Sequence, residues 1–518
     1  MPGASPPSPE RRRLLVAMGY LAAAGAGATE LLTGHGSHPA AASSSHSGTP
    51  AHGPTKAPAL HAAPAEPADD HIYDVVIHGG RVIDPDSGYD QVANVGIDGG
   101  TITAIKTATL KGKQTVAAAG KIVAPGFIDI LSYMPDDLGA TYKIGDGVTT
   151  NIGMHGLKAR AAAYFSQYTD NCLVHFGGAF SDPWNRNTEL DLQPGDAASP
   201  DQIKQLAATC EEDLHNGWIG VDFEPEYTPG IEFAEMKALG DVAKKYDVPC
   251  CFHGRYSAVG TNARCLNEII EVAKQTGAAV HVEHLISTGG TFDMANSIKR
   301  LQRAQDQGYS VTWCMYPYNF WATYLGSARF NYGWQSRFRI SYDDLQVAGT
   351  GDNTRLSEAT FRQYQRENKL VAAYAIPEAD VHTLLRDPQV MMGSDAILTD
   401  GNNHPRATGC FSRLLGKYVR EDKVLTFPEA LAKMTILAAR WLQPKAPALA
   451  KKGRLQRGAD ADITVFDPET VIDKSTVAVP KQFSAGIEWV LIAGQVAKTP
   501  DGVQTDTKHG QPIKSVLI

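Results

Sequence analysis

Short apolar segments alternate with helical segments through the middle of the chain, and this order constrains the fold more than any other feature. An alternation of strands and helices favours a parallel sheet or barrel. About eight strands are expected, which favours a (β/α)8 barrel. The clearest strands are expected at 148–152, 173–176, 220–223, 248–252, 279–282, 310–314 and 390–392, with helices at 199–215, 233–246 and 262–275.

The segment 121–133 is expected to lead into this barrel. Two apolar runs, 122–124 and 127–131, flank a Pro-Gly pair, which predicts a strand, a turn and a buried strand. Asp129 lies within the second run. Because burying an unpaired charge is costly, this carboxylate is expected to have a partner.

Both ends of the folded sequence are rich in short strands separated by Gly-containing turns. Residues 71–120 and 455–518 are therefore predicted to form one small β-sandwich, with the barrel occupying 121–454. The stretch 288–377 is longer than a loop between a strand and a helix requires, and it contains an aromatic cluster. It is predicted to be an inserted lid above the barrel.

The first 70 residues are not expected to belong to the fold. Arg11-Arg12-Arg13 precede an apolar, Ala-rich run, as in an export signal. Residues 1–34 resemble a twin-arginine signal peptide, so a periplasmic or extracellular location is expected. Residues 35–70, rich in Ala, Ser, Pro and His, are predicted to be a disordered linker. No integral membrane segment is expected in the mature chain.

Charge and cysteine content narrow the classes of function. The formal net charge is 48 − 56 = −8, and no strongly basic tract follows the first residues, which argues against a nucleic acid partner. The seven cysteines are odd in number and form no Cys-x-x-Cys pair, which argues against a disulfide scaffold and a zinc ribbon. A small-molecule substrate is the expected partner.

Polar residues that can carry chemistry occur at the ends of four expected strands. His155, His253, His284 and Asp395 each follow such a strand. In a barrel the carboxyl ends of the strands meet at one rim, where active sites lie. Three imidazoles and a carboxylate that converge there would suit Zn²⁺, or another divalent metal, with one position left for water.

The strand expected at 220–223 also ends in acidic residues: Asp222, Glu224 and Glu226. Two interpretations remain open for these carboxylates. They form ion pairs on the surface, or they meet a cationic group on the substrate.

The order of several motifs resembles one enzyme family. YDVVIHGGRVID, APGFID, GVTT, YTPG and MYPY are followed by GSDA, NHPRATGCFSRLLGKYVRE and GRLQRGADADITVFDP. Together they resemble the N-acyl-D-amino-acid deacylases (D-aminoacylases) of the metal-dependent amidohydrolase superfamily, over about residues 73–496. The resemblance implies a zinc-containing barrel that hydrolyses the amide bond of an N-acyl-D-amino acid.

The resemblance also assigns roles to the strand-end residues. His155 takes the place of a metal-binding Cys of the family, and His253 and His284 match its two later histidines. Imidazole is a good zinc ligand, so this exchange is chemically acceptable. Asp395 matches the essential Asp, which acts as general base on water and then gives the proton to the leaving amine.

One motif departs from the family. The His-x-His pair that follows PGFID is replaced by Leu131 and Tyr133. In the family this pair belongs to a second, weaker metal site, so a single zinc ion is expected here. The Tyr133 hydroxyl is predicted to lie near this zinc and to donate a hydrogen bond to a substrate oxygen.

Candidate substrate contacts follow from the same resemblance. The position of a family Lys that holds the substrate carboxylate is Ile286 here. Arg406 is predicted to grip a carboxylate, and Arg255 is a candidate for the lost Lys, although it could instead support the rim. Tyr316 and Tyr318 are predicted to line an acyl or aryl pocket, with packing of the lid as the alternative.

Three functions remain open from the sequence. The first is zinc-dependent hydrolysis of a C–N bond. The second is a repurposed enzyme of the same fold that catalyses cyclisation or acyl transfer on a specialised metabolite, which exclusion of water by the lid would favour. The third is a non-catalytic binding protein, suggested by the loss of the His-x-His pair.

Overall fold

The computed structural model describes residues 67–68, 70–400 and 403–516. The predicted export signal and nearly all of the predicted linker lie outside this part of the chain. Among the described residues, no helix is both long and apolar enough to cross a membrane.

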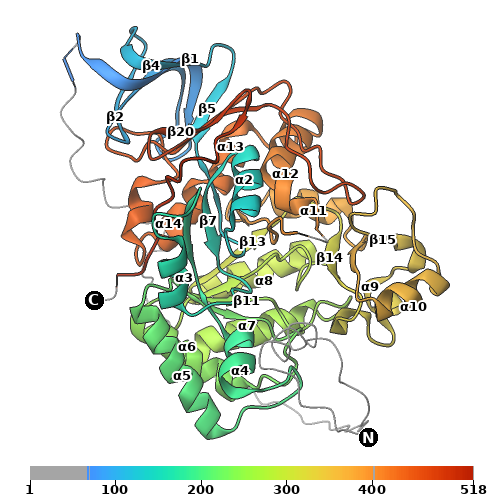
Figure 1. Ribbon diagram of the computed structural model, residues 1–518. Coiled ribbons are helices and arrows are strands. Elements are labelled where there is room, and N and C mark those ends of the chain that lie inside the picture. The colour runs from blue at the N-terminus through green and yellow to red at the C-terminus, as the bar shows by residue number, and fades with distance from the viewer. Residues whose placement is uncertain (1–66, 69, 401–402, 517–518) are drawn as a thin grey trace, which may run out of the picture. The chain divides into compact units, whose positions relative to one another are not determined.

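A (β/α)8 barrel forms the centre of the fold, as the sequence predicts (Figure 1). All strand pairs in it are parallel, in two runs with the orders β6-β7-β8 and β9-β10-β11-β12-β13-β17. β8 and β9 are consecutive parts of one strand position. The strands are β6 (Phe127–Asp129), β7 (Val148–Gly153), β8 (His175–Gly178), β9 (Phe180–Ser181), β10 (Val221–Phe223), β11 (Cys250–Phe252), β12 (Val280–Val282), β13 (Val311–Met315) and β17 (Met391–Met392).

Two helices of the barrel, α5 and α13, begin with a capping box. α5 shows this most clearly, because Ser199 caps it, Gln202 completes a capping box, and Pro occupies its first position. The helices are α2 (Asp137–Gly145), α3 (Ala161–Tyr168), α4 (Asp182–Leu190), α5 (Pro200–His215), α6 (Phe233–Tyr246), α7 (Asn262–Thr276), α8 (Met294–Asp306), α11 (Glu378–Leu385), α12 (Arg406–Arg413), α13 (Phe427–Met434) and α14 (Ile436–Leu442).

Strands from both chain ends form one nine-stranded sheet, with the order β21-β20-β19-β18-β5-β1-β2-β3 and β4 paired to β1. Both ends build one unit, as expected, but the strands are joined in a single hydrogen-bonded sheet. β5 belongs to this sheet, not to the barrel region to which the sequence assigned it. The strands are β1 (Ile72–Asp84), β2 (Tyr89–Asp98), β3 (Thr101–Lys106), β4 (Lys111–Ala117), β5 (Ile122–Pro125), β18 (Ile463–Phe466), β19 (Ile487–Ile492), β20 (Gln495–Thr499) and β21 (Gly502–Val503).

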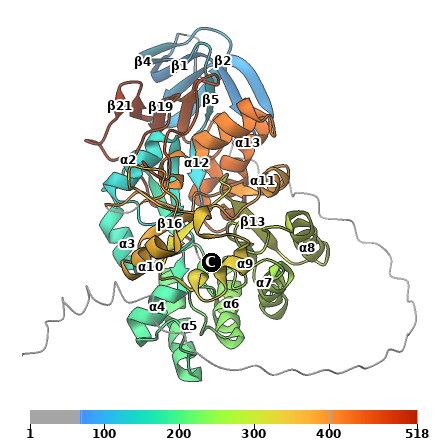
Figure 2. The same ribbon diagram turned by 90° about the vertical axis from the view of Figure 1, so that its right-hand side faces the viewer.

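The insertion is shorter than the predicted 288–377. Helix α8 and strand β13 fall inside that range but belong to the barrel, so the insertion proper is 316–377. It contains a small antiparallel sheet and two helices that group together in both views (Figures 1 and 2). These elements are β14 (Trp321–Tyr324), α9 (Trp334–Phe338), β15 (Leu345–Val347), α10 (Glu358–Arg366) and β16 (Leu370–Ala373).

Asp129 at the end of β6 has the partner that its burial requires. Lys143 Nζ lies 2.6 Å from Asp129 Oδ2, and Ser394 donates from its hydroxyl to Oδ2 at 2.6 Å and from its backbone N–H to Oδ1 at 2.9 Å. The backbone N–H of Leu131 also donates to Oδ1. This Asp129 network (Asp129, Lys143 and Ser394) joins the first barrel strand to α2 and to the segment after β17.

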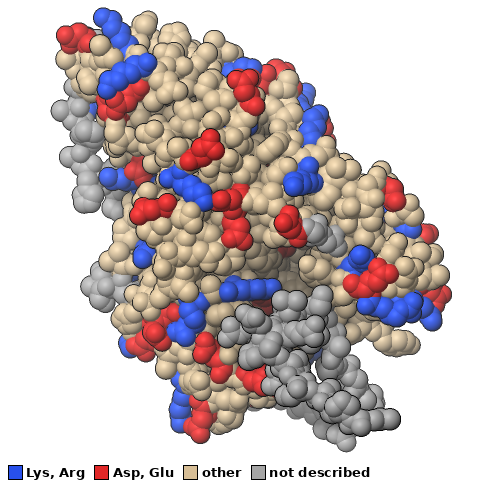
Figure 3. All heavy atoms as spheres, in the orientation of Figure 1, with Lys and Arg blue, Asp and Glu red and all other residues tan. Residues whose placement is uncertain are grey.

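Charged side chains are spread over the surface without a dominant sign. On the face drawn in Figure 3, basic and acidic side chains are interspersed, and no broad basic patch is visible.

Candidate metal centre and active site

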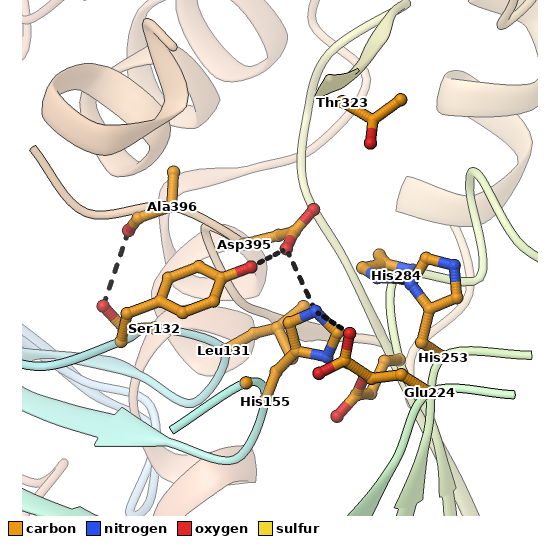
Figure 4. Close-up of polar contacts among 12 residues, drawn as sticks. Leu131, Ser132, His155, Glu224, His253, His284, Thr323, Asp395 and Ala396 are labelled. Carbon is orange, nitrogen blue, oxygen red and sulfur yellow. Dashed lines mark hydrogen bonds and ion pairs between the residues drawn. The ribbon is translucent and has the colours of Figure 1, made fainter. Parts of the chain in front are cut away.

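Three histidines from different barrel strands converge at one rim. His155 follows β7, His253 follows β11 and His284 follows β12, and candidate donor atoms of the three lie within 4.8 Å of one another. His253 Nδ1 and His284 Nε2 are 3.1 Å apart. Ligands at 2.0–2.1 Å from a tetrahedral zinc ion are separated by about 3.3 Å, so this donor set fits a divalent metal. Figure 4 shows the three rings side by side.

The second nitrogen of each ring has its own partner. His253 Nε2 lies 2.9 Å from Glu226 Oε2, and His284 Nδ1 lies 3.2 Å from Thr288 Oγ1. Such contacts fix the ring orientation of metal-binding histidines and leave the other nitrogen for the ion. His253 Nδ1 and His284 Nε2 are therefore the free donors.

His155 is held in a similar way. Its Nδ1 lies 2.7 Å from Glu283 Oε2, the distance of an ion pair but without the alignment of a hydrogen bond. Asp222 Oδ1 lies 3.7 Å from the same nitrogen. These contacts leave Nε2 as the donor that faces the centre.

Burial and neighbouring charges shift the pKa values of the three histidine rings in different directions. Burial lowers the pKa of His253 and, more strongly, that of His284, which keeps both rings neutral and able to bind a metal. Burial acts in the same direction on His155, but the ionisable groups of Tyr133, Glu224 and Glu283 outweigh it and raise the pKa of this ring.

Backbone strain marks the same place. His284 has φ of +28° and Asp395 has φ of +51°, a left-handed region that residues other than Gly rarely adopt. Such strain persists only where surrounding structure enforces it, and it concentrates at functional sites.

Asp395 lies beside the histidines, in the segment after β17. The Tyr133 hydroxyl donates to its Oδ1 at 3.0 Å, and Arg406 Nη2 lies 2.9 Å from its Oδ2. Its Oδ1 is also 4.0 Å from His155 Nε2. Burial, together with the charge of Asp395, raises the pKa of Tyr133 well above its usual value, so the phenol stays a hydrogen-bond donor.

Acidic residues surround His155 on the side of β10 and β12. Asp222 and Glu283 are 1% and 0% exposed, and the Glu224 side chain is 13% exposed. These three residues form the acidic cluster. The interpretation of Asp222, Glu224 and Glu226 as surface ion pairs is wrong, because Asp222 is 1% exposed and the side chains of Glu224 and Glu226 are 13% and 11% exposed. Asp222 lies in β10 and Glu283 follows β12, so both strands bring carboxylates to His155. Burial raises the pKa of Glu224 to about 7.

Leu131 lies just after β6, at the first of the two positions that depart from the His-x-His motif. It is 1% exposed and packs in an apolar cluster under the rim. A Cβ added at Gly393 would come within 2.5 Å of the Leu131 Cβ, so the two segments are in close contact. Leu131 therefore supplies apolar volume, as its chemistry requires.

The structure brings some of the predicted substrate residues to the site and directs others elsewhere. Arg406 stacks on Tyr316 at 4.0 Å, and the Tyr316 ring is 6.1 Å from that of His284. Arg255 instead binds Glu268 and the carbonyls of Pro229 and Ile231, so it supports the rim and does not replace the lost Lys.

Tyr318 does not join this group. Its hydroxyl donates to the carbonyl of Pro405 at 3.4 Å, and Arg413 stacks on its ring. Tyr318 is 1% exposed, which corresponds to the packing interpretation.

One functional residue escaped the sequence analysis. Arg329 of the insertion is 2% exposed and donates from Nε to Glu226 Oε2 at 2.8 Å and from Nη2 to the carbonyl of Ser287 at 3.2 Å. Glu226 therefore joins the insertion to His253. Arg329 lies far from the other site residues in sequence, and no local motif distinguishes it.

Comparisons with known proteins agree with this geometry. The sequence model of the amidohydrolase family matches residues 223–497. An N-acyl-D-glutamate deacylase of Alcaligenes xylosoxydans xylosoxydans is 32% identical over 464 residues, covering 81% of this chain and 93% of the relative. A D-aminoacylase from the same organism is 27% identical over 473 residues, covering 82% and 95%.

Solved structures give the same picture. The N-acyl-D-glutamate deacylase from Bordetella bronchiseptica, in complex with zinc and a phosphonate inhibitor, superposes with a TM-score of 0.75 at 26% identity. The alignment covers 86% of this chain and 100% of that structure. A D-aminoacylase structure aligns with a TM-score of 0.74 at 22% identity, which shows the shared fold.

Proposed function

The chain belongs to the amidohydrolase family, where it is a divergent relative of the N-acyl-D-amino-acid deacylases, and from this premise we propose that it hydrolyses an N-acyl-D-amino acid or a related amide. The observation that carries the proposal is the group of three buried histidines beside Asp395. Their free nitrogens fit one divalent metal, and zinc is the proposed ion. A non-catalytic binding protein, the third function left open by the sequence, would not require such a group.

His155, His253 and His284 would hold this metal. When bound, it would polarise the amide carbonyl and make a hydroxide nucleophile available near neutral pH. The neutral state that burial gives to His253 and His284 prepares them for this role.

Asp395 is the proposed acid and base of the reaction. Its carboxylate takes a proton from the attacking water and then passes it to the leaving nitrogen. Tyr133 and Arg406 fix the two oxygens of Asp395 at 3.0 and 2.9 Å, so the carboxylate is oriented before substrate arrives. The Tyr133 hydroxyl is also close enough to the centre to turn towards a substrate oxygen.

Arg406 is the proposed carboxylate-binding residue. Its Nε and Nη1 are buried and have no hydrogen-bond partner among the described residues. Leaving such donors unpaired is costly, and a substrate carboxylate that accepts from Nη1 would reduce this cost.

The proposal is tested by loading the protein with one equivalent of zinc and measuring hydrolysis of N-acyl-D-amino acids beside their L-enantiomers. Release of the D-amino acid, with loss of activity in a chelator and recovery on adding zinc, is expected. A protein that binds no metal, or that hydrolyses no member of the panel when loaded, would refute the proposal.

A second candidate is intramolecular cyclisation or acyl transfer at the same centre. The burial of the three histidines, each 4% exposed or less, favours it because water is largely excluded. Mass analysis of the products separates the two candidates: hydrolysis adds the mass of one water molecule, and cyclisation or transfer does not.

We also propose export by the N-terminal signal, which replacing the arginines at 11–13 with lysine would abolish.

A further inference from the structure

A second group of metal-ligating side chains lies away from the barrel rim. Glu378 and His382 are four residues apart on α11, and Asp422 follows the π-helical segment η3 (Leu414–Glu421). One candidate donor atom of each residue lies within 4.8 Å of the other two. We call Glu378, His382 and Asp422 the outer triad. Because α11 packs against α8 in the outer layer of helices, the outer triad is separate from the histidines of the barrel rim.

The imidazole of His382 faces both carboxylates of the outer triad. Its Nε2 lies 3.5 Å from Asp422 Oδ2 and 3.8 Å from Glu378 Oε1. The donors of a tetrahedral zinc ion are about 3.3 Å apart, so small side-chain movements would bring all three onto one ion. The same nitrogen is enclosed by protein and has no hydrogen-bond partner among the described residues. It is therefore available to an ion.

The ammonium group of Lys417 lies between the two carboxylates. Its Nζ is 3.1 Å from Glu378 Oε1 and 2.6 Å from Asp422 Oδ2, the same oxygens that face His382. This arrangement shows that the two oxygens favour a cation between them, but the ammonium leaves the imidazole nitrogen without a hydrogen bond. A divalent ion would bind all three donors, and the long Lys417 side chain, which is 25% exposed, can turn towards solvent.

Neighbouring groups hold the two carboxylates in place. The fully buried Tyr418 donates from its hydroxyl to Glu378 Oε1 at 2.9 Å. The backbone N–H of Asp422 donates to the carbonyl of Lys417 at 2.7 Å, a π-type bond between residues five apart that fixes the position of Asp422 at the end of η3. Hydrogen bonds of this kind orient the carboxylates that bind metals.

We propose that Glu378, His382 and Asp422 bind a second divalent metal ion, zinc, with water completing its coordination. One imidazole and two carboxylates are ligands that zinc accepts. Because Lys417 competes and only three side chains hold the ion, it is bound more weakly than at the barrel centre and is released by dialysis against metal-free buffer. The bound ion joins α11 to the segment after α12 and stabilises the part of the fold around β17. The inference does not depend on the proposed function.

Equilibrium dialysis of the full chain at rising free zinc tests this site. The wild type should bind one equivalent tightly and a second at higher zinc, and His382→Ala should lose only the second. Lys417→Met should bind the second equivalent about three- to thirtyfold more tightly, because no ammonium competes for the carboxylates. The histidines at 35–61 can also bind zinc weakly, so the measured quantity is the difference between the wild type and His382→Ala.

Two further variants serve as controls. His215→Ala, at an exposed histidine that bonds to Tyr246, should bind both equivalents as the wild type does. His253→Ala should lose the tight equivalent and keep the second, so a failure at the barrel centre leaves this inference decided on its own. Equal zinc binding by the wild type and His382→Ala, or no tightening in Lys417→Met, would overturn the inference.

Thermal unfolding gives an independent measurement. Raising free zinc from a level that fills only the barrel centre to about a hundred times the dissociation constant of the second site should raise the Tm of the wild type by about 3 °C. His382→Ala should show no such rise, and an equal rise in this variant would contradict the role of the outer triad. If His382→Ala does not fold, Asp422→Asn, which changes a residue nearer to solvent, replaces it in both measurements.

Discussion

Two buried polar groups in the same barrel differ in how completely they are paired. In the Asp129 network, Lys143 and Ser394 with nearby backbone groups satisfy both carboxylate oxygens, at distances from 2.6 to 3.2 Å. In the acidic cluster around His155, the backbone N–H of Gly156 donates to Asp222 Oδ2, but Asp222 Oδ1 and both Glu283 oxygens have no hydrogen-bond partner among the described residues. Asp129, Asp222 and Glu283 all lie at strand ends and are at most 1% exposed.

The difference indicates two uses of buried charge. A fully paired group recovers the cost of its own desolvation and can hold two segments together. In an incompletely paired group the cost of desolvation remains uncompensated. A metal ion or substrate that pairs with the group compensates this cost, which favours binding. We therefore infer that the polar residues of β6 have a structural role, and that the residues at the ends of β7, β10, β11 and β12 take part in the reaction.

The largest expected effect on the site comes from removing a metal-facing histidine. In His253→Ala we expect the bound metal to be lost and activity to fall to background, because the remaining donors no longer surround the ion. Metal analysis of the purified protein, beside activity, measures this. His215→Ala, at an exposed histidine that bonds to Tyr246 outside the site, should keep its metal; equal metal in both variants would contradict the assignment.

Breaking the Asp129 network should change stability instead of chemistry. Lys143→Met leaves Asp129 buried without its cation, which is expected to cost about 3–5 kcal/mol in the free energy of unfolding. Denaturant titration measures the loss, and the double variant with Asp129→Asn should recover part of it. If the folded Lys143→Met protein also lost its metal, the two groups would not be separate in function.

Glu226 tests the link between the insertion and the centre. Glu226→Gln is expected to weaken metal affinity by about ten- to a hundredfold, because His253 loses the carboxylate that orients its ring. Competition with a chromogenic chelator measures the affinity. Glu268→Gln, which breaks the rim pair with Arg255, is the matched control and should bind metal as the wild type does.

Tyr133 gives the smallest expected effect. Tyr133→Phe removes one hydrogen bond to Asp395, worth about 1–2 kcal/mol, so kcat should fall by about five- to thirtyfold with metal content unchanged. Steady-state kinetics on the best substrate measures it. Full activity would mean that the hydroxyl neither orients Asp395 nor contacts the substrate.

The site residues that belong to local motifs could be identified from the sequence. His155, His253, His284 and Asp395 each follow an apolar strand, and a barrel brings the ends of its strands to one rim, so their meeting could be expected. The resemblance to the deacylases supplied Arg406 and Tyr133 as candidates. For Arg255 the sequence left two roles open, because its position after His253 does not reveal the nearby acceptors Glu268, Pro229 and Ile231.

By itself, then, the sequence determined the barrel, the histidine set and the family, because periodicity and strand-end motifs are local properties of the chain. Only the tertiary structure decided which charges are paired. Lys143 Nζ lies 2.6 Å from the Asp129 carboxylate, and Arg329 of the distant insertion donates to Glu226 at 2.8 Å. No group among the described residues donates a hydrogen bond to the Glu224 carboxylate, whose ion-pair partner is His155. Pairing depends on distances between segments far apart in sequence, and those distances decide whether a buried carboxylate holds the fold together or remains available to a ligand.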